Sequence, residues 1–273
     1  MSFRKAAARL YDKTVLITGA SSGIGRATAL EFADVTQGKI KLILTARRLE
    51  RLNSFKSQLS SQYPDIKIHT EFLDVSKINT IREFFSHIPE EFKDIDVLVN
   101  NAGLALGKEQ VGEMKQEDID TVFNTNVMGN IEVVQNIVPF FKRKNSGDIV
   151  QLGSVAGREP YVGGSVYCAS KFAIRAFNTS LRQELMNTKI RVIEVQPGAV
   201  DTEFSTVRFK GDKKQADATY VAEPLYAEDI ADTIVYAVSR RQNVVIAESL
   251  IFPNNQAGGG SLRWEDPEWT GKK

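Results

Sequence analysis

The feature that most constrains the fold is a glycine-rich turn between a buried strand and a helix, near the start of the chain. Lys13–Thr18, read KTVLIT, is a short apolar run rich in β-branched residues, which is typical of a buried strand. The stretch GASSGIG follows directly, and a helical pattern continues to about Thr36. This order suits a dinucleotide, because the helix N-terminus offers free N–H groups to a phosphate.

The three glycines of this loop have separate expected roles. Gly19 allows a tight turn, Gly23 lets the backbone approach a pyrophosphate, and Gly25 lets helix and strand pack closely. The spacing is GxxxGxG rather than GxGxxG. A plain glycine-rich turn is the alternative, and the flanking strand and helix make it the weaker one. The predicted cofactor contacts here are Gly19, Ser21, Ser22, Gly23, Ile24 and Gly25.

Strands and helices alternate through the rest of the chain. Further strands are expected at residues 39–46, 66–73, 96–99, 147–154 and 190–196, with a last strand region at 244–246 and 249–252. Helices are expected at residues 49–62, 78–88, 116–144, 166–186 and 227–239. This order predicts an α/β fold with one parallel, doubly wound sheet and helices on both faces. Ligands bind such sheets at the carboxyl ends of the strands, where most of the motifs fall.

The length of 273 residues suits a single domain with a large core. We expect this catalytic domain to span residues 1–252. Residues 202–220 are polar and interrupted by glycine, which predicts a mobile substrate lid with a short helix. Residues 253–273 lack apolar periodicity and are predicted to form a C-terminal tail.

The end of the second strand indicates which cofactor is used. A site for NAD usually carries an acid there, which binds the ribose 2′-hydroxyl. Here Arg47 and Arg48 follow Ala46, and no acid is present. Guanidinium groups suit a 2′-phosphate, so the sequence predicts NADP(H). A solvated pair at the start of the next helix is the second interpretation.

The stretch from Gly153 to Lys171, read GSVAGREPYVGGSVYCASK, contains the candidate catalytic groups. On a helix, the spacing of Tyr167 and Lys171 places phenol and ammonium on one face. The ammonium is expected to lower the phenol pKa from its usual value of about 10, so that the pair exchanges a proton with an alcohol or ketone. Ser154 can donate a hydrogen bond to the same oxygen. The YxxxK pattern alone is common by chance.

Composition excludes several other functions. The net charge of +1 gives no field that attracts nucleic acid or an anionic membrane. The single cysteine, Cys168, fits a reducing compartment, so we expect a cytoplasmic protein. His69 and His87 are isolated and predict no metal site, and no apolar run is long enough to span a membrane. The basic start makes a transit peptide a weak alternative, because the first strand begins already at Lys13.

Taken together, the motifs resemble those of the short-chain dehydrogenase/reductase family. They are TGASSGIG at residues 18–25, NNAG at 100–103, Asn126, Ser154, YCASK at 167–171 and PG at 197–198. They occur in family order and extend over residues 13 to about 252. The resemblance implies a single Rossmann-like domain, a nicotinamide cofactor and, often, a homotetramer formed through the two long helices.

The resemblance also implies residue roles. Tyr167 would be the general acid/base, Lys171 would lower its pKa and bind the nicotinamide ribose, Ser154 would polarise the carbonyl, and Asn126 would hold a water that relays protons to Lys171. Asp74 would contact the adenine. The remaining implied cofactor contacts are Val75, Asn101, Ala102, Gly103, Pro197, Gly198, Val200 and Thr202.

Within the family, the stretch TEFSTVRFKGDKKQAD at residues 202–217 is similar to NADP-dependent 3-hydroxy acid dehydrogenases, which oxidise serine, allo-threonine and related acids. The pieces GREPYVGGSVYCASK and VVIAESLIFPNNQ resemble the fungal members of that group. Arg208 is the predicted ligand of the substrate carboxylate, because a guanidinium matches a carboxylate in bidentate geometry. A lid residue paired with Glu203 or Asp212 in solvent is the alternative for Arg208, and Arg158 is the other candidate ligand. A broad NADPH carbonyl or diketone reductase, and a silent NADP-binding regulator, are the alternative functions.

Overall fold

The structure, a computed structural model, describes residues 6–260 and 264–269. Its central sheet has the strand order β3-β2-β1-β4-β5-β6-β9, and all neighbours are parallel. The strands are β1 Thr14–Thr18, β2 Lys41–Ala46, β3 Lys67–Phe72, β4 Val97–Asn100, β5 Gly147–Leu152, β6 Ile190–Pro197 and β9 Glu248–Ile251. The chain order reverses at β1, which has β2 on one side and β4 on the other. The predicted doubly wound α/β fold is confirmed.

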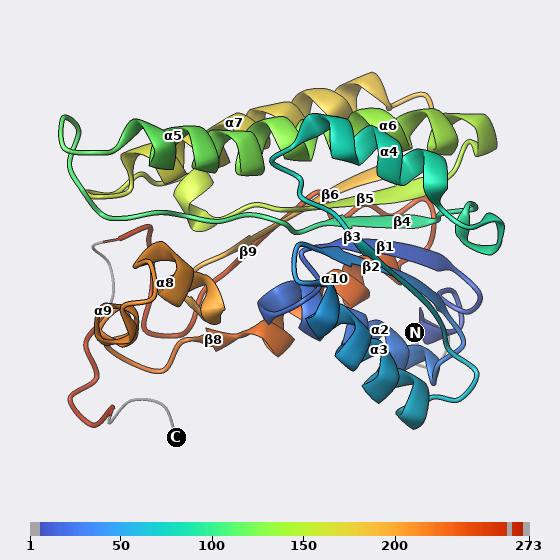
Figure 1. The fold of residues 1–273 in the computed structure, drawn as a ribbon, viewed down its shortest axis with the longest axis horizontal. Helices are drawn as coiled ribbons and strands as arrows, with labels where there is room; N and C mark the ends of the chain where they lie inside the picture. Colours follow the sequence, from blue (N-terminus) through green and yellow to red (C-terminus); the bar gives the residue numbers. More distant parts are fainter. Residues whose placement is uncertain (1–5, 261–263, 270–273) are drawn as a thin grey trace.

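Helices cover both faces of the sheet (Figure 1). One layer consists of α2 Gly23–Thr36, α3 Leu49–Gln62 and α10 Ala227–Val238. The other layer consists of α4 Ile78–His87, α5 Gln116–Phe123, α6 Asn130–Lys144 and α7 Ser165–Glu184. Among the helices of the described residues, none has the length and apolar character needed to cross a membrane.

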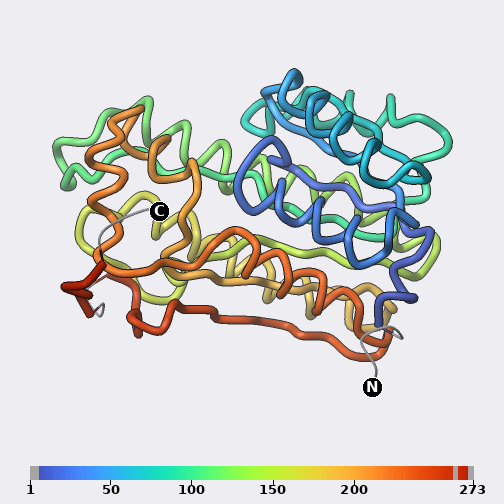
Figure 2. The backbone as a smooth tube through the Cα atoms, turned by 90° about the horizontal axis from the view of Figure 1, so that it is seen from below, coloured from blue at the N-terminus to red at the C-terminus, as the bar shows by residue number. Residues whose placement is uncertain are grey.

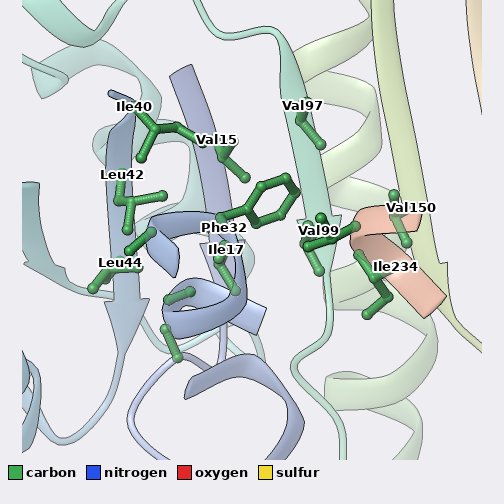
Figure 3. Packing of buried hydrophobic residues seen from close by; sticks show 14 of the residues in the cluster. Val15, Ile17, Phe32, Ile40, Leu42, Leu44, Val97, Val99, Val150 and Ile234 are labelled. Carbon is green, nitrogen blue, oxygen red and sulfur yellow. The ribbon is translucent and has the colours of Figure 1, made fainter. Parts of the chain in front are cut away.

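The two layers follow from the alternation of side chains along the strands. Val15 and Ile17 of β1 belong to the core cluster that also contains Phe32 of α2 and Ile234 of α10. Leu16, between them, belongs to the cluster on the opposite face. Figure 3 shows Phe32 directed toward the strands that carry residues of the first of these clusters, among them Val15. Because successive residues of a strand point to opposite faces, the continuous apolar run KTVLIT supplies both cores at once.

Two sequence-based predictions of regular structure are wrong. The helix expected over residues 116–144 is interrupted by a π-helical turn at Asn124–Gly129, which separates α5 from α6. Residues 244–246 form no strand, and only Glu248–Ile251 adds to the sheet. A short parallel pair, β7 Val200–Asp201 with β8 Leu225–Tyr226, was not expected, because two-residue strands leave no periodic pattern.

The lid segment contains two short helices, α8 Glu203–Arg208 and α9 Lys213–Asp217, rather than one. Figures 1 and 2 both place this segment beside the loop that follows β4. The described part of the predicted tail packs on the domain: Gln256 is buried and its side-chain oxygen accepts the N–H of Ala199. Residues 1–5, 261–263 and 270–273 lie outside the described residues, and with them lie the start of the transit-peptide alternative and parts of the predicted C-terminal tail.

Candidate active site

One pocket lies at the carboxyl ends of the strands, beneath α8. The predicted site residues that line it are Gly19, Ser21, Ser22, Gly23, Ile24, Arg47, Arg48, Asp74, Val75, Asn101, Ala102, Gly103, Ser154, Tyr167, Lys171, Pro197, Gly198, Val200 and Thr202. Three predicted residues are not part of the lining, namely Gly25, Asn126 and Arg208. The fold therefore brings motifs that are up to 183 residues apart in the chain (19 to 202) to one place.

The glycine loop is fixed by polar groups at the ends of β1 and β4. The Thr18 hydroxyl accepts the N–H groups of Asn101 and Ala102, each at 3.0 Å. In return, Asn101 Nδ2 donates to the carbonyls of Thr18 at 2.8 Å and Gly19 at 3.3 Å. These bonds satisfy backbone groups where the strands separate. They hold the loop against the NNAG turn at the point where the strand order reverses, which is where such sheets bind ligands.

The loop glycines are packed closely against neighbouring groups. A Cβ at Gly25 would lie 2.5 Å from Asn101 Nδ2 and 2.6 Å from the Gly19 carbonyl oxygen. Gly23 has φ +51°, and a Cβ there would lie 3.3 Å from Thr202. The backbone at Gly23 is therefore left open toward the pocket, as close approach of a pyrophosphate requires.

The cationic end of the pocket is built around Arg48. Its Nε donates to Ser21 Oγ at 3.1 Å, its Nη2 to Ser22 Oγ at 2.6 Å, and its Nη1 to the Glu203 carboxylate at 2.6 Å. Arg47 is exposed at the same end of the pocket. The guanidinium groups and hydroxyls here fit a phosphate, so the residues present suit NADP(H).

Asp74, the predicted adenine contact, lies beyond β3 on the pocket wall. Its Oδ1 accepts the backbone N–H of Ser76 at 3.1 Å and the hydroxyl of Ser76 at 2.7 Å. Both bonds fix the orientation of the carboxylate. The contact with adenine stays a prediction.

Tyr167 and Ser154 meet on the pocket wall. Tyr167 lies in the first turn of α7, and Ser154 follows β5. Burial raises the pKa of Tyr167, and the nearby Tyr161 adds to this, while a hydrogen bond with Ser154 and the charge of Arg208 act in the opposite direction. The expectation of a lowered pKa is therefore wrong for this structure, because burial outweighs the favourable neighbours. The phenol is held as a neutral acid.

Lys171 lies beneath the Tyr167 ring, with its Nζ 5.9 Å from the ring centre. The side chain is only 7% exposed, and its ammonium donates to the Leu152 carbonyl at 2.7 Å. Burial lowers the pKa of Lys171 to about 8, against the opposing charge of Glu194. The predicted side-by-side arrangement of the two residues on α7 is present, and the ammonium also donates a hydrogen bond to a backbone carbonyl at the end of β5.

Asn126 lies within the π-helical turn and is 1% exposed. Its Oδ1 accepts the N–H of Leu104 at 2.8 Å, and its Nδ2 donates to the Leu104 carbonyl at 2.7 Å and to Ser170 Oγ at 3.1 Å. The side chain thus joins the loop after β4 to α7, one residue before Lys171. π-Helical turns occur often at functional sites, because they re-aim side chains within a helix. The predicted proton relay through Asn126 stays a prediction.

Arg208, the predicted carboxylate ligand, is 8% exposed at the end of α8. Its Nε donates to the Gly107 carbonyl at 3.0 Å, its Nη1 to the Tyr161 hydroxyl at 3.0 Å, and its Nη2 to the Gly163 carbonyl at 2.9 Å. It pairs with neither Glu203 nor Asp212 in the described bonds, so the solvent-exposed alternative does not hold. Arg158, the other candidate, bonds to Gln196 and to the Glu248 carboxylate.

Several residues of the site were not anticipated from the sequence. Leu104, Phe204 and Val207 add apolar side chains to the lining of the pocket. The Phe204 ring lies edge-on to Tyr167, with ring centres 5.6 Å apart. Thr18 and Arg51 support the loop and the cationic end. Only Thr18 had a readable signal, a hydroxyl at the end of a buried strand; the others depend on how α8 folds back.

Comparison with known proteins places these observations in a family. The family model described as short chain dehydrogenase matches residues 13–213. An NADP-dependent 3-hydroxy acid dehydrogenase of Schizosaccharomyces pombe is 50% identical over 255 residues, which cover 93% of this chain and 97% of that protein. Sulfoacetaldehyde reductase 2 of Chromohalobacter salexigens is 40% identical and covers 89% of this chain and 95% of its own.

Among solved structures, the closed form of serine dehydrogenase complexed with NADP+ has a TM-score of 0.84 and 38% identity, covering 90% of this chain and 97% of that one. The chain therefore belongs to the short-chain dehydrogenase family, as its motifs indicated. The prediction of an oxidoreductase of this family is confirmed. The NADP in two of these descriptions agrees with the cofactor predicted from Arg47 and Arg48.

Proposed function

We propose that this protein transfers a hydride between NADP(H) and the 3-carbon of small 3-hydroxy or 3-oxo acids such as serine or allo-threonine. The observation that carries the proposal is that one pocket is lined by the Ser154–Tyr167–Lys171 group, the glycine loop and the Arg47–Arg48 end together. The names of the relatives support the substrate class, since two of them are 3-hydroxy acid or serine dehydrogenases.

The residues give a direct account of the proton step. NADPH, when bound, supplies the hydride, and NADP+ accepts it in the oxidative direction. Tyr167 is neutral because burial raises its pKa, so in the reductive direction the phenol can donate its proton to the substrate oxygen. Ser154 can donate a hydrogen bond to the same oxygen. Lys171, held by the Leu152 carbonyl under the ring, adds a positive charge that favours the phenolate left behind.

The proposed carboxylate recognition by Arg208 requires a change in its bonding. All three guanidinium nitrogens already donate to protein groups, and the residue does not line the pocket. A carboxylate would have to take the place of at least one of these acceptors. Two of them are backbone carbonyls, and the third is the side-chain hydroxyl of Tyr161. In the described arrangement Arg208 holds α8 against two loops, so it affects the site with any substrate.

A broad NADPH-dependent carbonyl or diketone reductase is the second candidate. It is favoured by the apolar lining at the substrate end, where Phe204, Val207 and Leu104 face the pocket. An uncharged ketone needs only such a surface and the Ser154–Tyr167 pair. The catalytically silent regulator is disfavoured, because the catalytic group is complete.

A kinetic screen with the purified protein separates the candidates. We expect NADP reduction with serine, allo-threonine and 3-hydroxypropionate, at a higher kcat/KM than NADPH oxidation with a neutral diketone of similar size. The reverse ranking would favour the carbonyl reductase. No turnover with any of these substrates, together with tight NADPH binding, would favour the regulator.

We also propose a cytoplasmic homotetramer assembled through α5–α6 and α7. The single cysteine is buried, as suits a reducing compartment, and the layer that contains these helices exposes Phe172 and Met128. Sedimentation velocity tests the assembly. Replacing Phe172 by Glu is expected to shift the protein to smaller species, whereas the equivalent change at the exposed Tyr236 of α10 is not.

A further inference from the structure

The cationic end of the pocket already contains an acidic group from the lid. One oxygen of Glu203 accepts Nη1 of Arg48 at 2.6 Å, and the carboxylate also accepts Nη1 of Arg51 at 2.7 Å and 3.0 Å. Burial acts to raise the pKa of Glu203, but the bonds from the two arginines outweigh it and hold the pKa below its usual value. The carboxylate is therefore ionised at neutral pH and bridges both guanidinium groups.

This bridge joins two parts of the protein that serve different ligands. Arg48 and Arg51 belong to the start of α3, directly after β2, where the sequence predicts the 2′-phosphate. Glu203 is the first residue of α8, the helix above the substrate end. A second acid, Glu228, lines the neighbouring surface pocket together with Arg51 and Glu203. It takes part in none of the ion pairs found among the described residues.

Arg48 does not need Glu203 to be held in place. Its Nε and Nη2 donate to the hydroxyls of Ser21 and Ser22, so two other anchors fix the guanidinium plane. The ion pairs with Glu203 are about half exposed, with side-chain exposures of 42% for Arg48, 46% for Glu203 and 52% for Arg51. Pairs of this exposure are weak, so another anion can compete for the same cations.

We propose that Glu203 is a specificity-determining residue that competes with the 2′-phosphate of NADP(H) for Arg48 and Arg51. The proposal rests on the proposed NADP-dependent function. Carboxylate and phosphate are both anions that accept bidentate bonds from guanidinium, and two such groups on one arginine repel each other. When the phosphate binds, Glu203 loses part of its hold on α3, so occupation of the cofactor end is linked to the tether of the lid.

The test is a calorimetric titration of the cofactor-free protein with NADP+, NAD+ and 2′,5′-ADP at low ionic strength. Glu203→Gln removes the charge and keeps the shape, and Glu228→Gln is the matched control, which removes one charge from the same pocket without touching an arginine. We expect Glu203→Gln to tighten NADP+ and 2′,5′-ADP by roughly two- to fivefold. NAD+ affinity should not change, and added salt should shrink the difference.

The same affinities in Glu203→Gln as in the unaltered protein, weaker binding of NADP+, or equal gains for NAD+ and NADP+ would each overturn the proposal. So would a Glu228→Gln variant that behaves like Glu203→Gln, since the effect would then be one of net charge. If Glu203→Gln does not fold, the cofactor affinities of Glu203→Ala test the proposal in the same way. If the unaltered protein binds NADP+ and turns over, a negative result concerns Glu203 alone; if it binds no NADP+, both proposals fail.

Discussion

The two walls of the pocket are built in different ways. The sheet wall consists of the carboxyl ends of the strands and the first turn of α7, and it contains the glycine loop, Ser154, Tyr167 and Lys171. Parallel ladders and bonds such as those between Thr18 and Asn101 hold it from within the core. The lid wall is α8, and side-chain bonds at both of its ends join it to other parts of the protein.

At one end of the lid wall, Glu203 bonds to the arginines of α3; at the other, Arg208 bonds to Gly107, Tyr161 and Gly163. This difference between the two walls indicates which wall suits proton transfer and which suits ligand recognition. Proton transfer needs groups held to a fraction of an ångström, which the buried wall provides. We propose that α8 serves recognition of cofactor and substrate, because a helix tied at its ends by side-chain bonds can adjust when a ligand binds.

The largest expected effect tests the sheet wall. Tyr167→Phe removes the phenol oxygen from the wall of the pocket and should lower kcat about a hundredfold or more, with NADPH affinity nearly unchanged. Tyr236→Phe, at an exposed position on α10, is the control and should be neutral. Steady-state kinetics and NADPH fluorescence titration give the two readouts. Near-normal kcat in Tyr167→Phe would remove the chemistry from this wall.

The sheet wall could be predicted almost entirely from the sequence, and the reason is local. The glycine loop, NNAG and YCASK are contiguous, and each follows or begins an element whose periodicity is readable. Their meeting then follows from the topology of a parallel sheet, because the carboxyl ends of its strands share one edge. What the sequence did not show was the pKa of Tyr167, which depends on burial by neighbours distant in the chain.

The lid wall could be predicted only as a polar segment near the site. Arg208 was expected to bind substrate, but its three acceptors come from loops 45 to 101 residues away in sequence. The bridge from Glu203 to Arg48 spans 155 residues. The loops that contain Gly107 and Gly163 have no periodic sequence pattern. Hydrogen bonds between such irregular segments depend on the three-dimensional course of the chain. The resemblance named Asn126 as a site residue, and its helix was expected to be continuous, whereas the structure places it in a π-helical turn.

The second effect tests the cationic end, where the two walls meet. Replacing Arg47 and Arg48 by alanine should erode the preference for NADP over NAD by about tenfold or more for each charge-assisted bond that is lost. Ala46→Asp should act in the same direction by restoring the acid that binds the ribose. The measurement is the ratio of kcat/KM for the two cofactors. Equal values in the unaltered protein would contradict the assignment of this end to a phosphate.

The third effect tests the far end of the lid wall. Arg208→Leu removes three hydrogen bonds that hold α8, so kcat/KM should fall about tenfold or more for serine and for a neutral diketone alike. A carboxylate contact adds a further loss for serine alone, so the ratio of the two losses measures that contact. Equal losses would make Arg208 a support of the lid, and no loss on either substrate would move the search for a carboxylate ligand to Arg158.

The smallest effect concerns the stability cost of the sheet wall. Burial lowers the pKa of Lys171 to about 8, below its ordinary value of 10.5. Between these values the unfolded chain binds more protons than the folded one, so the contribution of Lys171 to the free energy of unfolding rises with pH across this window and is least favourable below it. Lys171→Met should therefore be more stable than the unaltered protein at pH 7.

The measurement is the difference in the free energy of unfolding between the two proteins, taken from urea titrations at pH 7 and near pH 10. Lys171→Met lacks the titrating group and keeps every other one, so the difference isolates Lys171. We expect it to narrow by on the order of 1–2 kcal/mol as the pH rises, less than the full shift implies because unfolded and folded chains relax around the charge. If this difference in the free energy of unfolding widened with pH, the Leu152 carbonyl and Glu194 would stabilise the ammonium more than burial destabilises it. The buried cation of the sheet wall would then carry no cost in stability.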